Sequence, residues 1–254
     1  MRGNALNRHT VTVALLWVVL TAVSEALAIA FVEFPVSAAR EGRVIDDAFK
    51  LQTLLAIPVF TFVIAALVYS VLAFRRRGDT EEDGPPVRTH RAWVGFWFVW
   101  TTALVTFVII HPGFTGLSKI RAGASEKVDV TVQATGAQWL WQFKYPDQDI
   151  TTINEIVLPV GKNIKFEVRS NDVLHSAWVP AFRMKIAAVP GITTHMYGRS
   201  ERTGTFDDDY KFRMQCAELC GLSHATMFAR VRVLEQDEFD AWVASKTAAV
   251  RSAN

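Results

Sequence analysis

Soft-metal donors gather in one short stretch of the chain. Cys216, Cys220, His224 and Met227 lie within twelve positions, and the two cysteines are the only ones in the protein. Thiolate, imidazole and thioether together form the ligand set of redox-active copper rather than that of magnesium, calcium or manganese. A further strong donor, His175, lies upstream in a separate segment. The pattern therefore predicts a copper site assembled from one distant histidine and a loop that joins the last two strands of a small β-barrel.

Other chemistries use some of the same side chains. A disulfide between Cys216 and Cys220 is allowed in an exported domain, but it leaves His224 and Met227 without a role. A closed zinc site of two cysteines and two histidines would not need Met227, and the spacing is not that of a zinc finger. A mononuclear blue-copper site would leave one cysteine spare. The full donor set fits best if both thiolates bridge two copper ions.

The motif Cys-Ala-Glu-Leu-Cys-Gly-x-x-His-x-x-Met, with Asp-Val-Leu-His-Ser upstream, resembles subunit II of cytochrome c oxidase, which carries the dinuclear copper A centre. The resemblance covers about residues 50 to 235. It implies that the two cysteines bridge the coppers and that His175 and His224 each bind one. It also implies that Met227 and the backbone carbonyl of Glu218 are weak ligands. The side chain of Glu218 would reach a magnesium or manganese ion at the boundary with subunit I.

An aromatic segment over residues 136–146, GAQWLWQFKYP, resembles the place where the family receives electrons from cytochrome c. The resemblance gives that role to Trp139. The family usually has tyrosine where this chain has Leu140, often an acid where it has Lys144, and often aspartate where it has Ala187. These losses weaken the case for a strongly basic donor, because charge complementarity mainly sets encounter rate and orientation. Cytochrome c or another small electron donor is the expected partner.

Three apolar stretches long enough to cross a bilayer, which takes about 20 residues, precede the copper motif: residues 11–33, 52–74 and 92–111. The first also resembles a secretory signal, with Arg2 and Arg8 ahead of an apolar core and small residues at 26–28. Its apolar character continues to Val32, which favours a retained helix. Two helices plus a cleaved signal peptide are the alternative.

Charge sets the predicted orientation of these helices. Arg75-Arg76-Arg77 follow the second stretch, and positively charged loops stay in the cytoplasm. Residues 78–91 are therefore expected inside, and everything after about Gly113, where proline and glycine end the third helix, outside. Residues 1–113 would form the anchor of a multi-pass protein in the bacterial inner (plasma) membrane. The family's proton-pathway glutamate is missing, because the inner end of the third helix reads His90-Arg91-Ala92-Trp93.

Residues 114–254 are predicted to form the outer copper A domain. Short runs of alternating apolar and polar residues, separated by Gly, Pro, Asp and Asn, mark strands of a half-exposed sheet at 128–133, 139–145, 155–158, 163–168, 210–214 and 228–234. Such strands suggest a Greek-key sandwich or barrel, and the copper ligands require the cupredoxin-like Greek-key β-barrel. Residues 235–247 read as a closing helix with acids in its first turn. The expected fold class is a membrane-anchored α + β protein.

Composition and resemblance together define the expected function. Half of the 254 residues are hydrophobic and the net charge is +2, which gives no argument for nucleic acid. The resemblance implies a subunit of a haem–copper terminal oxidase that passes electrons from copper A to haem in subunit I, where oxygen is reduced to water and protons are pumped. The haems lie in subunit I, and other oxidase subunits and the lipid bilayer are further partners. A copper-A nitric oxide reductase would share such a subunit, and a membrane-anchored copper-binding protein is the alternative outside the enzymes.

Overall fold

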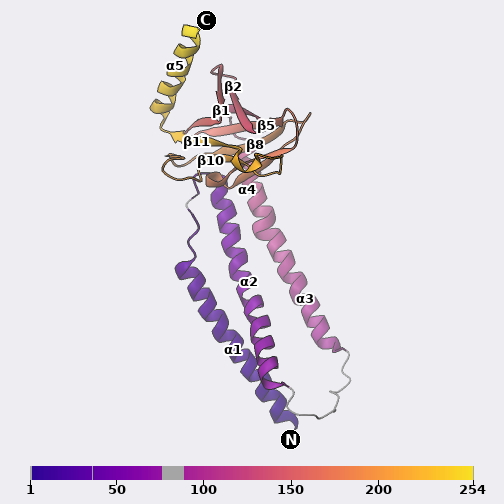
Figure 1. Ribbon diagram of the computed structural model, residues 1–254. Helices are drawn as coiled ribbons and strands as arrows, with labels where there is room; N and C mark the ends of the chain where they lie inside the picture. Colours follow the sequence, from indigo (N-terminus) through magenta and orange to yellow (C-terminus); the bar gives the residue numbers. More distant parts are fainter. Residues whose placement is uncertain (1, 36, 76–88, 254) are drawn as a thin grey trace. The chain divides into compact units, whose positions relative to one another are not determined.

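The computed structural model describes residues 2–35, 37–75 and 89–253 (Figure 1). The chain divides into two compact units. The helical unit comprises Met1–Pro35 and Asp47–Phe114, and the β unit comprises Val36–Asp46 and Thr115–Asn254. The predicted inner loop falls mostly on residues 76–88, which lie outside the described residues.

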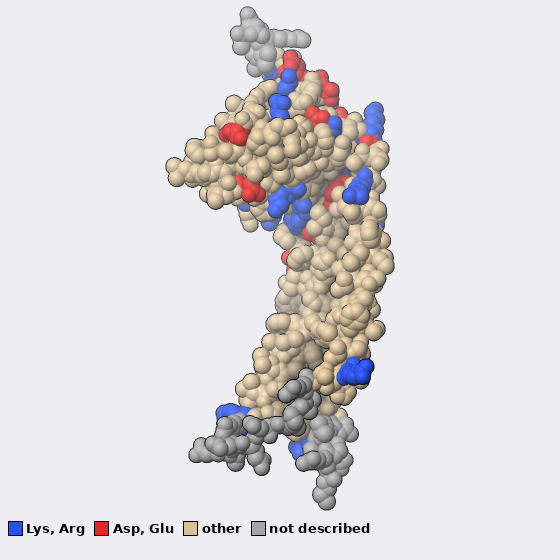
Figure 2. Space-filling view, turned by 90° about the vertical axis from the view of Figure 1, so that its right-hand side faces the viewer, with Lys and Arg blue, Asp and Glu red and all other residues tan. Residues whose placement is uncertain are grey.

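Among the described residues, three helices are long and apolar enough to cross a membrane, over Arg8–Phe31, Arg40–Ala73 and Arg91–Ala124. They correspond to α1 (Arg2–Phe31), α2 (Arg40–Ala73) and α3 (Arg91–Val108), the last continuing through a π-helical turn and α4 (Thr115–Ala124). On the face drawn in Figure 2, the helical unit shows a largely uncharged surface. The expectation of three apolar N-terminal helices is confirmed.

One of the predicted helix boundaries differs from the structure. The second helix begins at Arg40 rather than at residue 52, because its polar first turns pack in the β unit instead of following an apolar pattern. The third helix leaves helical geometry at His111 (φ −137°, ψ 115°), one residue before Pro112. This fits the steric restriction that a proline places on the preceding residue. The third helix therefore ends about where it was predicted to end, and a separate short helix, α4, follows the kink.

Polar side chains join α1 to α2 within the helical unit. The indole Nε1–H of Trp17 donates to the carbonyl of Pro58 at 2.8 Å. The hydroxyls of Thr21 and Thr61 lie 2.7 Å apart, which is hydrogen-bonding distance. In an apolar surrounding, such side chains hold helices together because their polar atoms have few other partners.

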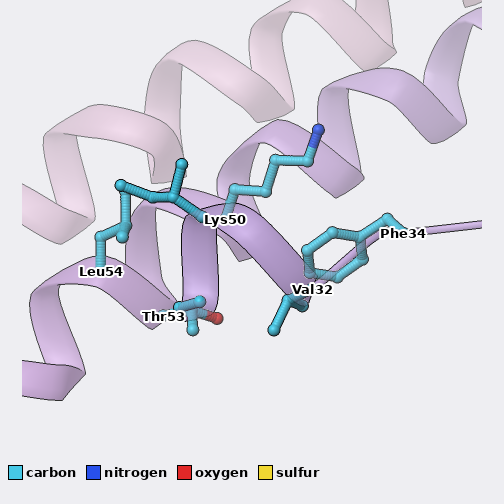
Figure 3. A pocket seen from close by; sticks show the side chains of 7 residues that line it. Val32, Phe34, Lys50, Thr53 and Leu54 are labelled. Atoms are coloured by element: carbon cyan, nitrogen blue, oxygen red, sulfur yellow. The ribbon is translucent and has the colours of Figure 1, made fainter. Parts of the chain in front are cut away.

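A cavity of about 250 Å³ also lies in the helical unit, beside α1 and α2 (Figure 3). Val32, Phe34 and Leu54 give it apolar walls, and the ammonium of Lys50 lies 5.7 Å from the centre of the Phe34 ring. Its lining contains no cysteine, histidine or methionine. The cavity is therefore separate from the soft-metal donors.

The β unit is built from two sheets. The first has the order β3-β2-β1-β5-β8 and the second the order β4-β11-β10-β6-β7, with β9 paired to β11. The first sheet consists of β1 (Val130–Ala137), β2 (Leu140–Tyr145), β3 (Ile150–Ile153), β5 (Asn163–Ser170) and β8 (Thr194–Arg199). The second consists of β4 (Glu155–Pro159), β6 (His175–Val179), β7 (Met184–Ala188), β9 (Gly204–Thr205), β10 (Arg213–Cys216) and β11 (Phe228–Leu234).

The two sheets form an open sandwich rather than a closed barrel. Most neighbouring strands are antiparallel, but β1 pairs with β5 and β4 with β11 in parallel, which requires crossovers between the sheets. Apolar side chains of alternate strand residues meet between the sheets, as alternation predicts. The largest fully buried ones include Trp141, Phe143, Tyr145, Ile150, Ile156, Leu158, Ile164, Phe166 and Met214. The cupredoxin-like fold class is confirmed, with the sandwich replacing the barrel.

The ends of the β unit are also fixed by packing. Helix α5 (Gln236–Ala253) covers part of the sandwich through Phe239 and Trp242, and the Trp242 ring lies 5.3 Å from that of Tyr145. At the other end, residues 37–46 join the sandwich: the backbone N–H of Ala38 donates to the carbonyl of Ala181 at 2.8 Å. The start of α2 is therefore part of the β unit.

Candidate metal centre

The sheet topology explains how distant donors meet. Cys216 ends β10, and Met227 directly precedes β11, so the loop between these antiparallel neighbours carries the cysteine-rich motif. His175 begins β6, which pairs with β10 so that Cys216 lies opposite Ala177. Strand pairing thus brings a residue 41 positions upstream to the first cysteine.

The two cysteine sulfurs lie at the middle of the donor set. Cys216 Sγ and Cys220 Sγ are 3.8 Å apart and both thiols are free. Each sulfur has its own histidine: Cys216 Sγ lies 3.7 Å from His175 Nδ1, and Cys220 Sγ lies 3.6 Å from His224 Nδ1. Within the described part of the chain, His175, Cys216 and Cys220 form a group whose donor atoms all lie within 4.8 Å of one another.

Two weaker donors complete the arrangement. The thioether sulfur of Met227 lies 3.7 Å from Cys220 Sγ. The backbone carbonyl oxygen of Glu218 lies 3.2 Å from Cys216 Sγ. The carboxylate of Glu218 belongs to an exposed residue. Every donor expected from the sequence is therefore brought to one place.

The spacing of the donors fits soft metal ions. Two donor atoms that each lie about 2.2 Å from one tetrahedral ion are about 3.6 Å apart, close to the 3.6–3.8 Å between neighbouring sulfur and nitrogen atoms here. Three of the donors are almost fully buried: His175 at 0%, Cys216 at 1% and Met227 at 0% exposure. Burial raises the pKa of the Cys220 thiol to about 11, with Cys216 adding to the shift. Binding a metal would therefore displace a proton.

The ring of His175 is oriented by Asp172, a residue that sequence reasoning did not identify. His175 Nε2 lies 2.8 Å from Asp172 Oδ1. Burial acts to raise the pKa of Asp172, but hydrogen bonds from the backbone N–H groups of Gln138 and Val173 and from His175 hold it at about 2. The ionised carboxylate favours a proton on Nε2, which leaves Nδ1 facing Cys216 as an acceptor. The Asp-x-x-His spacing was the available signal.

The faces of the same ring are held by Gly136 and Trp141. A Cβ placed on Gly136 would lie 3.0 Å from His175 Cδ2 and 3.1 Å from Trp141 Cζ3, closer than most real Cβ contacts. The indole of Trp141 meets the imidazole edge to face, with centroids 6.0 Å apart. A side chain at position 136 would therefore push against the histidine.

Trp139 lies beside the loop that carries the cysteines. A Cβ on Gly221 would lie 3.4 Å from the Trp139 ring. Gly221 also has a φ of +119°, a backbone conformation that residues with a side chain rarely adopt. The indole of Trp139 remains 36% exposed. Leu219 and Leu222 in the same loop are 80% and 94% exposed. Large exposed apolar side chains beside a buried donor set suit contact with a partner.

Several known proteins are similar to this chain. The family model described as cytochrome c oxidase subunit II, periplasmic domain, matches residues 148–234. Cytochrome c oxidase subunit 2 of Alkalihalophilus pseudofirmus is 36% identical over 205 residues, which cover 79% of this chain and 58% of that relative. The subunit 2 of Thermostichus vulcanus is 28% identical, covering 82% of this chain and 76% of that protein. The crystal structure of the periplasmic domain of subunit II of cytochrome oxidase (CoxB) of Bradyrhizobium japonicum is 36% identical, with a TM-score of 0.45, and covers 48% of this chain and 96% of that chain.

Three apolar helices precede a cupredoxin-like sandwich that carries soft metal donors beside two neighbouring strands. These features define the class as a membrane-anchored protein with a cupredoxin-like domain. Within that class, the chain belongs to the cytochrome c oxidase subunit II family. It spans little more than half the length of the Alkalihalophilus relative and about three quarters of the Thermostichus relative. These relatives are subunits of cytochrome c oxidase, an oxidoreductase. The matched range of 148–234 contains every donor residue, whereas Trp139 lies outside it.

Proposed function

We propose that this chain is the electron-accepting subunit of a haem–copper oxidase and that its donor set holds a dinuclear copper A centre. The observation that carries the proposal is the placement of two free thiols 3.8 Å apart, each with its own histidine within 3.7 Å. A pair of bridging sulfurs flanked by one imidazole on each side matches the donors of two metal ions rather than one. When bound, the copper pair supplies one-electron storage.

The chain's own residues hold and insulate this centre. Cys216 and Cys220 would hold the copper pair through their thiolates, and His175 and His224 would supply one nitrogen each. Met227 and the carbonyl of Glu218 would be the weak donors, since the Met227 sulfur lies 3.7 Å from Cys220 Sγ and the carbonyl oxygen lies 3.2 Å from Cys216 Sγ. The nearly complete burial of His175 and the cysteines excludes water. Such enclosure favours a resident metal over an exchangeable one, which speaks against a copper carrier.

Two surface residues are assigned to electron transfer and assembly. Trp139 is proposed to receive electrons from cytochrome c or another small donor, because its ring is exposed on one side and packs toward Gly221 of the ligand loop. Glu218 has an exposed carboxylate next to its ligating carbonyl. We assign this carboxylate to a magnesium or manganese ion shared with subunit I, whose haem receives the electron. Oxygen reduction and proton pumping would take place in that partner.

The expected location is the bacterial inner membrane, with the β unit on the outer side. Three helices of sufficient length and apolarity support a membrane anchor. The family model that matches residues 148–234 describes a periplasmic domain. A protease added to intact spheroplasts should therefore cut within residues 115–254 and leave an inner epitope intact. Protection of the β unit in intact spheroplasts would reverse the assigned orientation.

The metal assignment is tested by electron paramagnetic resonance on the full-length chain, purified in detergent, stripped of metal and titrated with copper. We expect two coppers per chain and one unpaired electron split by two equivalent copper nuclei. Cys216→Ser should remove this signal, whereas Ser223→Ala in the same loop should keep it. A one-copper pattern, or zinc bound with no signal, would reject the dinuclear centre.

A further inference from the structure

The end of β1 and the turn after it contact both ligand-bearing loops. Residues 136–138, which we call the strut, are not metal donors in the proposed site. The backbone N–H of Gln138 donates to Asp172 Oδ2 at 2.7 Å. The side-chain amide of Gln138 donates through Nε2 to the carbonyl oxygen of Cys220 at 2.6 Å. One residue therefore binds the loop before His175 and the loop after Cys216.

The link from the strut to His175 passes through Asp172. Asp172 uses Oδ2 for the backbone of Gln138 and Oδ1 for the ring of His175, at 2.7 Å and 2.8 Å. The backbone N–H of Asn171 also donates to the carbonyl of Gly136 at 3.0 Å. The missing Cβ of Gly136 leaves the room that the imidazole occupies. The strut therefore orients the His175 ring through Asp172, and Gly136 leaves the space that the ring occupies.

The link to Cys220 acts on the backbone rather than on the sulfur. Gly221 follows Cys220 with a φ of +119°, and a Cβ built on it would meet both Gln138 and Trp139. A Cβ there would lie 2.9 Å from Gln138 Nε2. The side-chain amide of Gln138 therefore contacts the ligand loop at the position where the loop turns.

From these contacts we infer that Gln138 is a positioning residue: its amide ties the Cys220 loop to the Asp172–His175 pair, so that both halves of the donor set are held before metal binds. Gly136 supports this role by admitting the His175 ring. The inference rests on the proposed copper function. It adds a residue whose removal should loosen the site without removing a ligand. Partners of this kind commonly change metal affinity by about 10- to 100-fold.

The test uses the full-length, metal-free chain in detergent and copper as the probe. Gln138→Leu keeps the backbone N–H that binds Asp172 and removes only the amide that binds Cys220. We expect two coppers still to bind, with an affinity lowered by about tenfold or more in chelator competition, and a copper hyperfine pattern that becomes less symmetric. Gln142→Leu, an exposed glutamine of β2, is the matched control and should bind like the unchanged protein.

Gly136→Ala is the second variant, with Gly116→Ala as its control because a Cβ on Gly116 meets only Val44 at an ordinary 3.6 Å. Gly136→Ala should change the hyperfine pattern more than Gly116→Ala does. Thermal unfolding of each metal-free variant separates positioning from general stability, since a purely structural role would lower the unfolding temperature and leave the spectrum unchanged. Wild-type affinity and spectrum in Gln138→Leu would overturn the inference. Failure of the unchanged protein to bind a copper pair would instead reject the proposed function.

Discussion

Met227 shows how a weak donor can be distinguished from a packing residue. Its side chain is fully buried, and its sulfur lies 3.7 Å from Cys220 Sγ. A buried methionine in a β-sandwich usually fills space, and thioether sulfur is also a soft ligand. A substitution that removes the sulfur but keeps the side-chain volume separates the two roles, because only the loss of a ligand would change the reduction potential.

We predict that Met227→Leu leaves two coppers bound and changes the reduction potential, because an axial ligand tunes the potential of a copper centre. A swap that conserves volume should cost less than about 1.5 kcal/mol of stability. Spectroelectrochemical titration measures the potential, and thermal unfolding measures the stability. Met214→Leu in β10 is the control, since it is equally buried and has no assigned role at the metal. An unchanged potential in Met227→Leu would remove Met227 from the ligand set.

At the scale of strands, Tyr145 joins the two sheets. It ends β2 in the first sheet, and its hydroxyl donates to the carbonyl of Val157 at 3.0 Å while accepting from the N–H of Val157 at 2.8 Å. Val157 lies in β4, an edge strand of the second sheet. The tyrosine therefore satisfies backbone groups that no neighbouring strand reaches. Burial raises the pKa of its hydroxyl, which keeps it protonated as a donor.

We predict that Tyr145→Phe destabilises the β unit by about 2 kcal/mol or more, because an unpaired buried group costs about 1–3 kcal/mol and both groups of Val157 lose their partner. Thermal unfolding of the metal-free chain followed by near-ultraviolet circular dichroism is the measurement. Tyr210→Phe is the matched control, since Tyr210 is 62% exposed and surface changes stay within about 0.5 kcal/mol. Equal unfolding temperatures for the two variants would show that the link between sheets contributes little.

At the scale of helices, the contacts between α1 and α2 bear on the fate of the N-terminal helix. Trp17 with Pro58 and Thr21 with Thr61 form two polar contacts within the helical unit. The His9 ring makes a third, 2.6 Å from the hydroxyl of a tyrosine on α2. A signal peptide that is removed after export would not need three specific polar contacts with α2.

We therefore predict that α1 remains in the purified protein. The intact mass of the chain isolated from its native membrane should include residues 1–31. Signal peptidase inhibition should leave that mass unchanged. A mature chain that begins soon after the small residues at 26–28 would contradict the prediction.

At the scale of the whole chain, the donor set was predictable because it is local. Four of the donors fall in one motif, and their chemistry is read from residue type. Asp172 lies three residues before His175, which is a readable signal, whereas Gln138 was not predictable because its bonds to Asp172 and Cys220 join residues 34 and 82 positions apart. Helix α2 was predicted to begin too late because residues 40–50 carry charges and no apolar periodicity. The strands β3, β6, β7, β8 and β9 were not predicted, because they are short and lack a clear alternation of apolar and polar residues.

The polar start of α2 shows what the apolar pattern could not reveal. Glu41 is 2% exposed, and its carboxylate accepts from Arg40 and from the backbone N–H of Arg199 in β8 at 2.9 Å. The buried carboxylate of Glu41 therefore ties residues 37–46 to the sandwich within the β unit. Removing the charge of Glu41 should weaken its bonds to Arg40 and to the N–H of Arg199, and a hydrogen bond to a charged group contributes about 1.5–3 kcal/mol.

We predict that Glu41→Gln increases hydrogen exchange across residues 36–46 and lowers the unfolding temperature of the β unit. Glu201→Gln is the matched control, because its ion pair with Arg43 is a surface pair in which the arginine is 63% exposed, worth at most about 1 kcal/mol. The donor residues contact neither position, so the copper spectrum should be the same in both variants. Equal exchange in the two variants would mean that the segment is held by its backbone pairing alone, through Ala38 and Ala39.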